Sequence, residues 1–415
     1  MHRGRLIRII LIILILGMGG FLIVRNISLK KQLKNGEISN ITSKDFLPFG
    51  GNGGGGGSII KNIFNTNDNE KDINEVKTPL IKIHDSVAGS IIVNIPDEIA
   101  PSTGLDKNGN KIYDTTLAIR YVTKENGFVY DYIPKYQKSY LISDTPIPKV
   151  SFAHFSPNGN TILFQYLDID LITEKSILGT LGNNTVTVLP NNIISYAFSK
   201  NGKFVYVQKT NNGAKFILKN EVGKESVIYE SELSEWNVNF LGEENLLITT
   251  KASEYADGFS YIININNKTV KRLWTNVTAL TTKASLGGNF ILRGETEKSG
   301  PKLSLYNVKT GELSPLGKMG MVEKCSFSED ETTLTCAIPK SFENRPYPDD
   351  WYLGIIETND GIIRYTTQNK NTRIISDLEQ DSGNPIDVLE LKVNNSGSMT
   401  IFINKKTSEL YLYEE

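Results

Sequence analysis

The sequence predicts an all-β protein, a seven-bladed β-propeller preceded by one transmembrane helix and a flexible linker. Three observations predict it. A short hairpin sequence recurs through most of the chain, an uncharged apolar run stands near the N-terminus, and a glycine-rich stretch separates the two. The expected parts are a membrane anchor with basic flanks at 1–35, a linker at 36–78 and the propeller at 79–415.

The N-terminal segment has the composition of a membrane span. Three arginines surround the start of an apolar run that covers residues 6–24. A helix of that length measures about 28 Å, close to the thickness of the hydrocarbon core of a bilayer. Apolar residues follow the small residues Gly17–Gly20, which favours an uncleaved anchor over a cleaved signal peptide. Because a very short basic tail usually stays in the cytoplasm, we expect a single-pass protein of the cell membrane with an extracytoplasmic propeller.

Residues 36–78 have the composition of a tether. Glycine fills seven of the eight positions from Gly50 to Gly57, and ordering such a chain costs a large amount of backbone entropy. The residues that follow are mostly polar and cannot bury a core. We therefore expect a flexible linker between the membrane and the propeller.

The repeated hairpin predicts the propeller itself. The sequence SFAHFSPNGNTILFQY, at 151–166, places two strands around a turn in which Gly159 takes a position that needs a positive φ. Two more short strands follow before the pattern restarts as SYAFSKNGKFVYVQ at 195–208. A period of about 40 to 45 residues with four strands is typical of propeller blades. The residues before successive turns are Phe155, Phe198, Phe240, Leu286, Phe327 and Val393, with an insertion before the last.

The ends of the repeat region set the number of blades. Residues 88–143 supply four strands ahead of the first clear repeat, whereas the last unit contains only the three strands VLELKVN, MTIFIN and ELYLY. A bare sheet edge invites pairing with other chains. We therefore expect the strand PLIKI, at 79–83, to complete the last blade, which gives seven blades; six or eight stay open as alternatives.

The turns FSPNG at 155–159 and FSKNG at 198–202 resemble the WD40-like, TolB-type (PD40-like) propeller repeats of bacterial envelope proteins, which usually read F-S-P-D-G. Phe327 and Ser328 keep the start of this pattern, and the sequence then departs from it. The order of anchor, linker and propeller also resembles membrane proteins of candidate-phylum bacteria. The resemblance implies a non-catalytic platform that binds a protein or polymer of the envelope.

Composition and motifs exclude several function classes. Lysine and arginine total 45 against 46 aspartates and glutamates, so there is no electrostatic case for binding nucleic acid. Two cysteines and three scattered histidines are too few for a zinc or iron site. No catalytic motif is present, and no catalytic residue is predicted. An extracytoplasmic carbohydrate-active enzyme stays open as the alternative, because paired carboxylates from different blades in the propeller channel cannot be recognised in sequence.

The two cysteines fit a disulfide. If the hairpin FSEDETTL is centred between Asp330 and Glu331, Cys325 and Cys336 lie directly opposite each other on paired strands. Two reduced core cysteines are the alternative. A disulfide would favour an oxidising, extracytoplasmic compartment.

The stretch DKNGNKIYD is a candidate calcium loop. Asp106, Asn108, Asn110 and Asp114 carry oxygen side chains at loop positions that commonly bind calcium. Lys111, however, stands where such loops prefer glycine, and no bidentate glutamate follows. Calcium is therefore the one candidate cofactor, and an ordinary Asn-Gly turn explains the same letters.

The insertion PKSFENRPYPDDWYLG, at 339–354, gathers aromatic and charged residues between prolines. This mixture is typical of interface residues, so the loop is the predicted binding site for a protein partner in the envelope. The alternative places Trp351 and Tyr352 in the core as part of a following strand, WYLGIIE. The candidate binding residues are Arg345, Tyr347, Asp349, Asp350 and Trp351.

Overall fold

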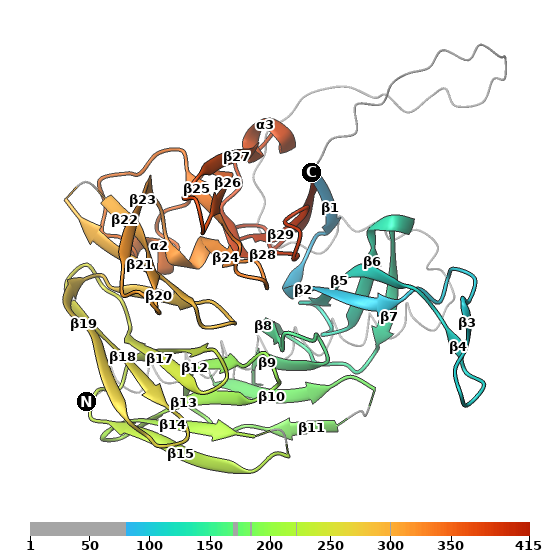
Figure 1. Cartoon of the computed structure of the whole chain (residues 1–415), viewed down its shortest axis with the longest axis horizontal. Coiled ribbons are helices and arrows are strands. Elements are labelled where there is room, and N and C mark those ends of the chain that lie inside the picture. The colour runs from blue at the N-terminus through green and yellow to red at the C-terminus, as the bar shows by residue number, and fades with distance from the viewer. Residues whose placement is uncertain (1–79, 169–172, 183–184, 221, 299) are drawn as a thin grey trace, which may run out of the picture. The chain divides into compact units, whose positions relative to one another are not determined.

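The computed structural model describes residues 80–415 except 169–172, 183–184, 221 and 299 (Figure 1). Seven four-stranded antiparallel sheets account for nearly all of this part of the chain. One small hairpin, β3 (Gly104–Leu105) with β4 (Lys111–Ile112), extends from the connection that follows the first strand of blade one. The prediction of an all-β, seven-bladed propeller is confirmed.

Blades one to six each use four strands in chain order. Blade one consists of β2 (Val87–Pro96), β5 (Thr115–Thr123), β6 (Val129–Ile133) and β7 (Lys138–Ser143). Blade two consists of β8 (Val150–Phe155), β9 (Thr161–Leu167), β10 (Glu174–Thr180) and β11 (Thr185–Val188). Blade three consists of β12 (Ile193–Phe198), β13 (Phe204–Thr210), β14 (Gly213–Lys219) and β15 (Glu225–Ser231). Blade four consists of β16 (Trp236–Leu241), β17 (Asn245–Thr250), β18 (Asp257–Asn264) and β19 (Val270–Thr278). Blade five consists of β20 (Thr281–Ala284), β21 (Phe290–Glu297), β22 (Gly300–Asn307) and β23 (Leu313–Met319). Blade six consists of β24 (Cys325–Phe327), β25 (Thr333–Pro339), β26 (Asp360–Thr366) and β27 (Thr372–Asp377).

Blade seven closes the ring with a strand from the other end of the propeller. It consists of β28 (Val388–Val393), β29 (Met399–Asn404), β30 (Leu410–Glu414) and β1 (Leu80–His84). The strand β1 pairs antiparallel with β30, with Leu80 opposite Tyr413. Figure 1 shows the blue β1 beside the red strands of this blade. The expected completion of the last blade by PLIKI is confirmed, and every strand of the sheet has its hydrogen-bonding partner.

The first strand of each blade lies innermost. β2 contacts both β8 and β28, β16 contacts β12 and β20, and β24 contacts β28. These inner strands therefore surround the central axis, and side chains from distant parts of the sequence meet there. The hydrophobic core lies between neighbouring sheets; between blades three and four it includes Phe216 and Trp236, whose ring centroids are 6.0 Å apart.

A buried serine explains why the hairpin sequence repeats. Ser156 accepts a hydrogen bond at its hydroxyl oxygen from the N–H of Thr161, across the turn. The equivalent serines of blades three, five and six, Ser199, Ser285 and Ser328, do the same for Lys203, Phe290 and Thr333. All four serines are buried. Each therefore satisfies a main-chain donor that the tight turn would otherwise leave unpaired inside the protein.

Helical segments are few in the described part of the chain. They are two 3-10 turns, η1 (Pro134–Tyr136) and η2 (Val322–Lys324), and two short helices, α2 (Asp349–Tyr352) and α3 (Leu378–Ser382). The alternative that placed Trp351 and Tyr352 in a strand is wrong, because both lie in α2 and the next strand begins at Asp360. The same alternative placed Trp351 in the core, and this part is confirmed, because Trp351 is buried.

The predicted membrane anchor and linker precede the part of the chain that the structure describes. The anchor at 6–24 and the linker at 36–78 lie outside the described residues. Within 80–415, as far as these are described, no helix is long and apolar enough to cross a bilayer.

Candidate functional site

The predicted calcium loop folds as a tight turn between β3 and β4. The Asp106 carboxylate accepts hydrogen bonds from the main-chain N–H groups of Asn108 and Asn110 and from the Asn110 side chain. These bonds, the Asn110 side chain first, lower the pKa of Asp106. The described residues contain no group of three or more His, Cys, Asp or Glu side chains that could hold a metal ion. Calcium binding by Asp106, Asn108, Asn110 and Asp114 stays a prediction.

The predicted binding loop forms a cap, which we define as residues 340–359, between β25 and β26. Tyr347 and Trp351 are buried, and they pack with Met321 and Ile356 in a separate small core. Their rings therefore hold the cap in place and do not form an exposed surface. Arg345, at the surface, lies 3.4 Å from the Asp350 carboxylate.

The cap extends over several blades. Asp349 accepts a hydrogen bond from the N–H of Glu254 in blade four, and the Glu254 carboxylate accepts one from the N–H of Tyr347. The Tyr347 carbonyl accepts a bond from Thr296 of blade five. On the other side, Lys405 of blade seven donates to the Trp351 carbonyl at 2.5 Å. The loop is thus fixed to blades four, five and seven.

A buried ion network holds the base of the cap. Lys324 is fully buried, and its ammonium lies 2.6 Å from the Asp360 carboxylate and 2.5 Å from that of Asp387. It also donates to the Thr358 hydroxyl at 2.8 Å. The Trp351 indole N–H donates to both Asp387 oxygens at 3.0 Å. Burial raises the pKa of Asp360, and the Lys324 charge opposes this. One ammonium group thus lies between two buried carboxylates, and both carboxylates accept hydrogen bonds from it.

A second group of charges lies on the inner strands, and we call it the inner-strand cluster. Its contacts join blades that are far apart in sequence. The imidazole of His154 packs against the ring of Tyr196 at an interplanar angle of 55°, with centroids 4.7 Å apart. The His154 Nδ1 lies 3.4 Å from a Glu390 oxygen, and Lys392 lies 4.0 Å from the other Glu390 oxygen. The cluster consists of His154 on β8, Tyr196 on β12, Lys283 on β20, and Glu390 and Lys392 on β28.

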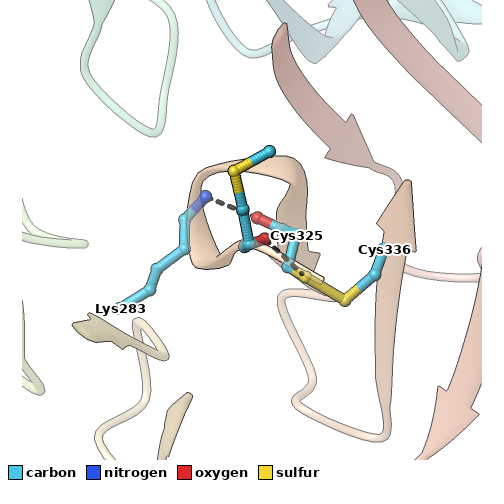
Figure 2. The surroundings of a disulfide bond; sticks show 4 residues. Lys283, Cys325 and Cys336 are labelled. Carbon is cyan, nitrogen blue, oxygen red and sulfur yellow. Dashed lines mark hydrogen bonds between the residues drawn. A yellow bond between two sulfur atoms is a disulfide. The ribbon is translucent and has the colours of Figure 1, made fainter. Parts of the chain in front are cut away.

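Lys283 connects this cluster to the disulfide. Cys325 and Cys336 lie opposite each other in the register of β24 and β25 and are joined by a disulfide bond. Figure 2 shows the Lys283 ammonium directed at the Cys325 carbonyl oxygen, to which it donates at 2.5 Å. The hairpin register inferred from FSEDETTL is therefore the one in the structure.

Burial shifts the pKa values of four residues of the inner-strand cluster. Burial, followed by the nearby charge of Lys392, lowers the pKa of Lys283 from 10.5 to about 8. Burial also lowers the pKa values of Lys392 and His154 and raises that of Tyr196 well above its usual range. His154 is therefore mainly neutral near pH 7, whereas Lys283, with a pKa of about 8, remains mainly charged.

The sequence did not single out this cluster. Its members are titratable residues on strands of four or six residues, separated by more than two hundred positions from first to last, as the pair His154 and Glu390 illustrates. The one available signal was their position: each lies on the first strand of a blade. Only the blade alignment makes such positions neighbours around the axis.

No protein-family model matches the sequence, and no curated protein matches it. Solved structures resemble the fold. An oligogalacturonate lyase in complex with manganese is 10% identical, with a TM-score of 0.53 over 79% of this chain and 98% of the lyase. The oligogalacturonate lyase of Vibrio parahaemolyticus is 10% identical, with a TM-score of 0.51 over 82% of this chain and 94% of the lyase.

TolB from Acinetobacter baumannii is also 10% identical, at a TM-score of 0.42 over 79% of this chain and 80% of that one. TolB is thus among the structures that this chain resembles, although a score this low carries no argument. At these identities the likeness shows the fold alone. The fold that these structures share with this chain is, in the described residues, a seven-bladed β-propeller.

Proposed function

We propose that the protein is a membrane-anchored binding platform, held outside the cytoplasm by residues 6–24 and binding an envelope protein or polymer through its cap. The apolar segment and the glycine-rich linker of the sequence support the membrane location. The bond between Cys325 and Cys336 supports an oxidising compartment. A rigid propeller on a long tether suits recognition of a partner at some distance from the membrane.

The observation that carries the proposal is the contrast between the base of the cap and its surface. The base is fixed by the buried Trp351 and the Lys324 network. Leu353 and Ile355, just after α2, are 73% and 55% exposed, and Tyr255, next to the Glu254 that binds Asp349, is 79% exposed. Apolar side chains exposed on a rigid support are typical of a protein interface.

The test is crosslinking of the intact protein in its own cells, followed by mass spectrometry. The variant Leu353→Asp/Ile355→Asp changes the surface of the cap without touching its buried base. The control is Ile374→Asp on β27, the outermost strand of blade six, where the isoleucine is 77% exposed and lies outside the cap. A partner lost in the cap variant and retained in the control supports the proposal. A partner retained in both shows that the cap is not the binding site.

The second candidate is an extracytoplasmic carbohydrate-active enzyme. One observation favours it: Glu390 and Glu323 each influence the pKa of Lys283, and each has one buried carboxylate oxygen without a hydrogen-bond partner among the described residues. Two such carboxylates are the minimum that glycoside hydrolysis requires. The assay is turnover of a panel of glycans by the intact protein and by Glu390→Gln and Glu323→Gln. The enzyme function requires turnover by the parent that both variants lose.

A further inference from the structure

The network at the base of the cap places one amine and two carboxyl groups in direct contact inside the protein. The side chains of Lys324 and Asp360 are 0% exposed, and that of Asp387 is 3% exposed. The Lys324 nitrogen lies 2.6 Å from Asp360 Oδ2 and 2.5 Å from Asp387 Oδ1. A nitrogen this close to a carboxyl oxygen is about 3–3.5 Å from the carboxyl carbon, which is the separation of groups that are ready to react. The contact therefore has the geometry for an amide bond as well as for an ion pair.

The two carboxyl groups have different hydrogen-bond partners. Both Asp387 oxygens accept a bond from the Trp351 indole N–H at 3.0 Å, and Oδ1 accepts another from the Thr358 hydroxyl at 2.9 Å. Asp387 thus has the hydrogen bonds that a charged carboxylate requires inside a protein. Asp360 Oδ1, in contrast, is buried and has no partner among the described residues. Burial raises the pKa of Asp360, so Oδ1 is the atom that carries its proton.

One residue of blade seven holds both reacting groups. The Val388 N–H donates to Asp360 Oδ2 at 2.8 Å, and the Val388 carbonyl accepts from the Lys324 nitrogen at 3.1 Å. The Trp351 ring centroid lies 4.9 Å from the same nitrogen. These contacts fix the amine and the acid relative to each other and exclude water from the space between them. Because hydrolysis of an amide consumes water, a dry interior favours the amide over the separate groups.

We propose that Lys324 and Asp360 form an intramolecular isopeptide bond, with Asp387 as the base. Asp387 accepts one proton from the Lys324 ammonium, and the free amine attacks the Asp360 carboxyl carbon. The bond from that carbon to the Asp360 hydroxyl oxygen breaks. The hydroxyl group leaves as water with a second proton from the nitrogen. The products are one amide bond, one water molecule and protonated Asp387, so no oxidant, cofactor or other reactant is needed.

This bond would connect two segments that meet at the base of the cap. Lys324 is the last residue of η2, and Asp360 is the first residue of β26, directly after the cap and 36 positions along the chain. The link would close a covalent loop that contains the whole of the cap. The cap would then remain attached to the start of blade six when its hydrogen bonds break. The proposal does not depend on the proposed function.

Mass spectrometry of the full-length protein, reduced, denatured and digested, tests the proposal. We expect a linked pair of peptides, one with Lys324 and one with Asp360, whose mass is the sum of the two peptides less one water. Fragmentation of the pair identifies the two joined residues. Recovery of only the unlinked peptides overturns the proposal. A pair that joins Lys324 to Asp387 also overturns it, because Asp387 is then the acid and not the base.

The variant Asp360→Asn tests which carboxyl group reacts. An asparagine at this position forms the same amide and releases ammonia in place of water. We therefore expect its linked peptides to have the same mass as those of the parent, although the two sequences differ. A linked pair of any other mass, or a linked pair absent from the folded variant, contradicts the assignment of Asp360.

The base is tested by Asp387→Asn, which we expect to lower the linked fraction of freshly purified protein by about tenfold or more. Circular dichroism identifies a variant that fails to fold, and the mass of the parent peptides decides the proposal in that case. Lys324→Arg keeps a cation but has no amine that can form the link, so no linked pair should form. The control is Lys251→Met, a surface lysine of blade four, which should retain the full linked fraction. Equal linkage in the parent and in folded Asp387→Asn excludes Asp387 as the base.

Discussion

Lys324 is fully buried and Lys283 is partly buried, and the two lysines differ in the groups that surround their ammonium groups. Lys324 has two carboxylates, a hydroxyl and a main-chain carbonyl around its ammonium. Lys283 donates to one main-chain carbonyl, and the charges of Lys392, Glu323 and Glu390 act on it from beyond hydrogen-bond distance. The first arrangement uses its charge to hold the cap, whereas the second holds its charge without a carboxylate at salt-bridge distance. The difference teaches that the partners of a buried charge, more than its burial, decide how much that charge contributes to stability.

The largest effect is expected at the matched lysine. Lys324→Met leaves the Asp360 and Asp387 carboxylates buried together without a cation, and we expect it to lower the free energy of unfolding by about 3–5 kcal/mol. Urea denaturation followed by circular dichroism measures the change. Lys251→Met serves as the surface control. A loss below about 1 kcal/mol would mean that the network does not stabilise the fold, and the comparison with Lys283 would fail.

The disulfide next to Lys283 should have the second largest effect. Replacing Cys325 and Cys336 by serine releases a short cross-strand link, and we expect a loss of about 2–4 kcal/mol in the free energy of unfolding. Unfolding of the parent should shift by a similar amount when a reductant is added. The double variant should not respond to the reductant. A response of the variant would show that the reductant acts elsewhere.

Lys283→Met should change stability little at pH 7, by about 1 kcal/mol or less, because the direct partner that Lys283 leaves behind is a main-chain carbonyl and not a paired carboxylate. Its signature is the pH dependence. The lowered pKa means that the unfolded state binds more protons between pH 8 and 10.5, so the parent gains stability relative to the variant as the pH rises through that window.

Charges that face Lys283 also contribute to this dependence, namely Lys392, Glu323 and Glu390. The difference between parent and variant isolates the Lys283 contribution, and it is measured by urea denaturation at a series of pH values. A difference that stays constant from pH 7 to 10.5 would contradict the lowered pKa. It would also make Lys283 resemble an ordinary surface lysine.

The smallest effect is expected at the surface of the cap. Arg345→Ala removes an ion pair between the exposed arginine and the less exposed Asp350, and ion pairs that solvent reaches contribute about 0–1 kcal/mol. We expect a change in the free energy of unfolding within about 0.5 kcal/mol, and a smaller one at high salt. A larger loss would indicate that Arg345 belongs to the base of the cap together with Trp351.

The fold could be predicted because its signals are local. In blades two, three and five the serine and the glycine of the turn lie three residues apart, and the apolar strands repeat with a period of about 40 to 45 residues over most of the chain. The completing strand β1 followed from a physical requirement, that a sheet edge be covered. These features depend on nearby residues or on a general rule, so one sequence contains enough information to infer them.

The candidate site depends on contacts that no local pattern contains. Tryptophan is a residue type that is common at interfaces, but the Trp351 indole contacts Asp387 and Lys324 from other parts of the chain. The inner-strand cluster arises only when β8, β20 and β28 come together around one axis. Predicting either requires the position of each blade in three dimensions, which the spacing of turns alone does not give.

The pairing of β1 with β30 has a consequence for synthesis of the chain. The contact between Lys82 and Glu409 joins residues 327 positions apart. A ribosome makes β1 first among the strands and β30 last, so the ring cannot close until nearly the whole propeller has emerged. Until then both strands are open edges that can pair with another nascent chain. Premature termination before Leu410 would therefore yield not a smaller propeller but an aggregation-prone one.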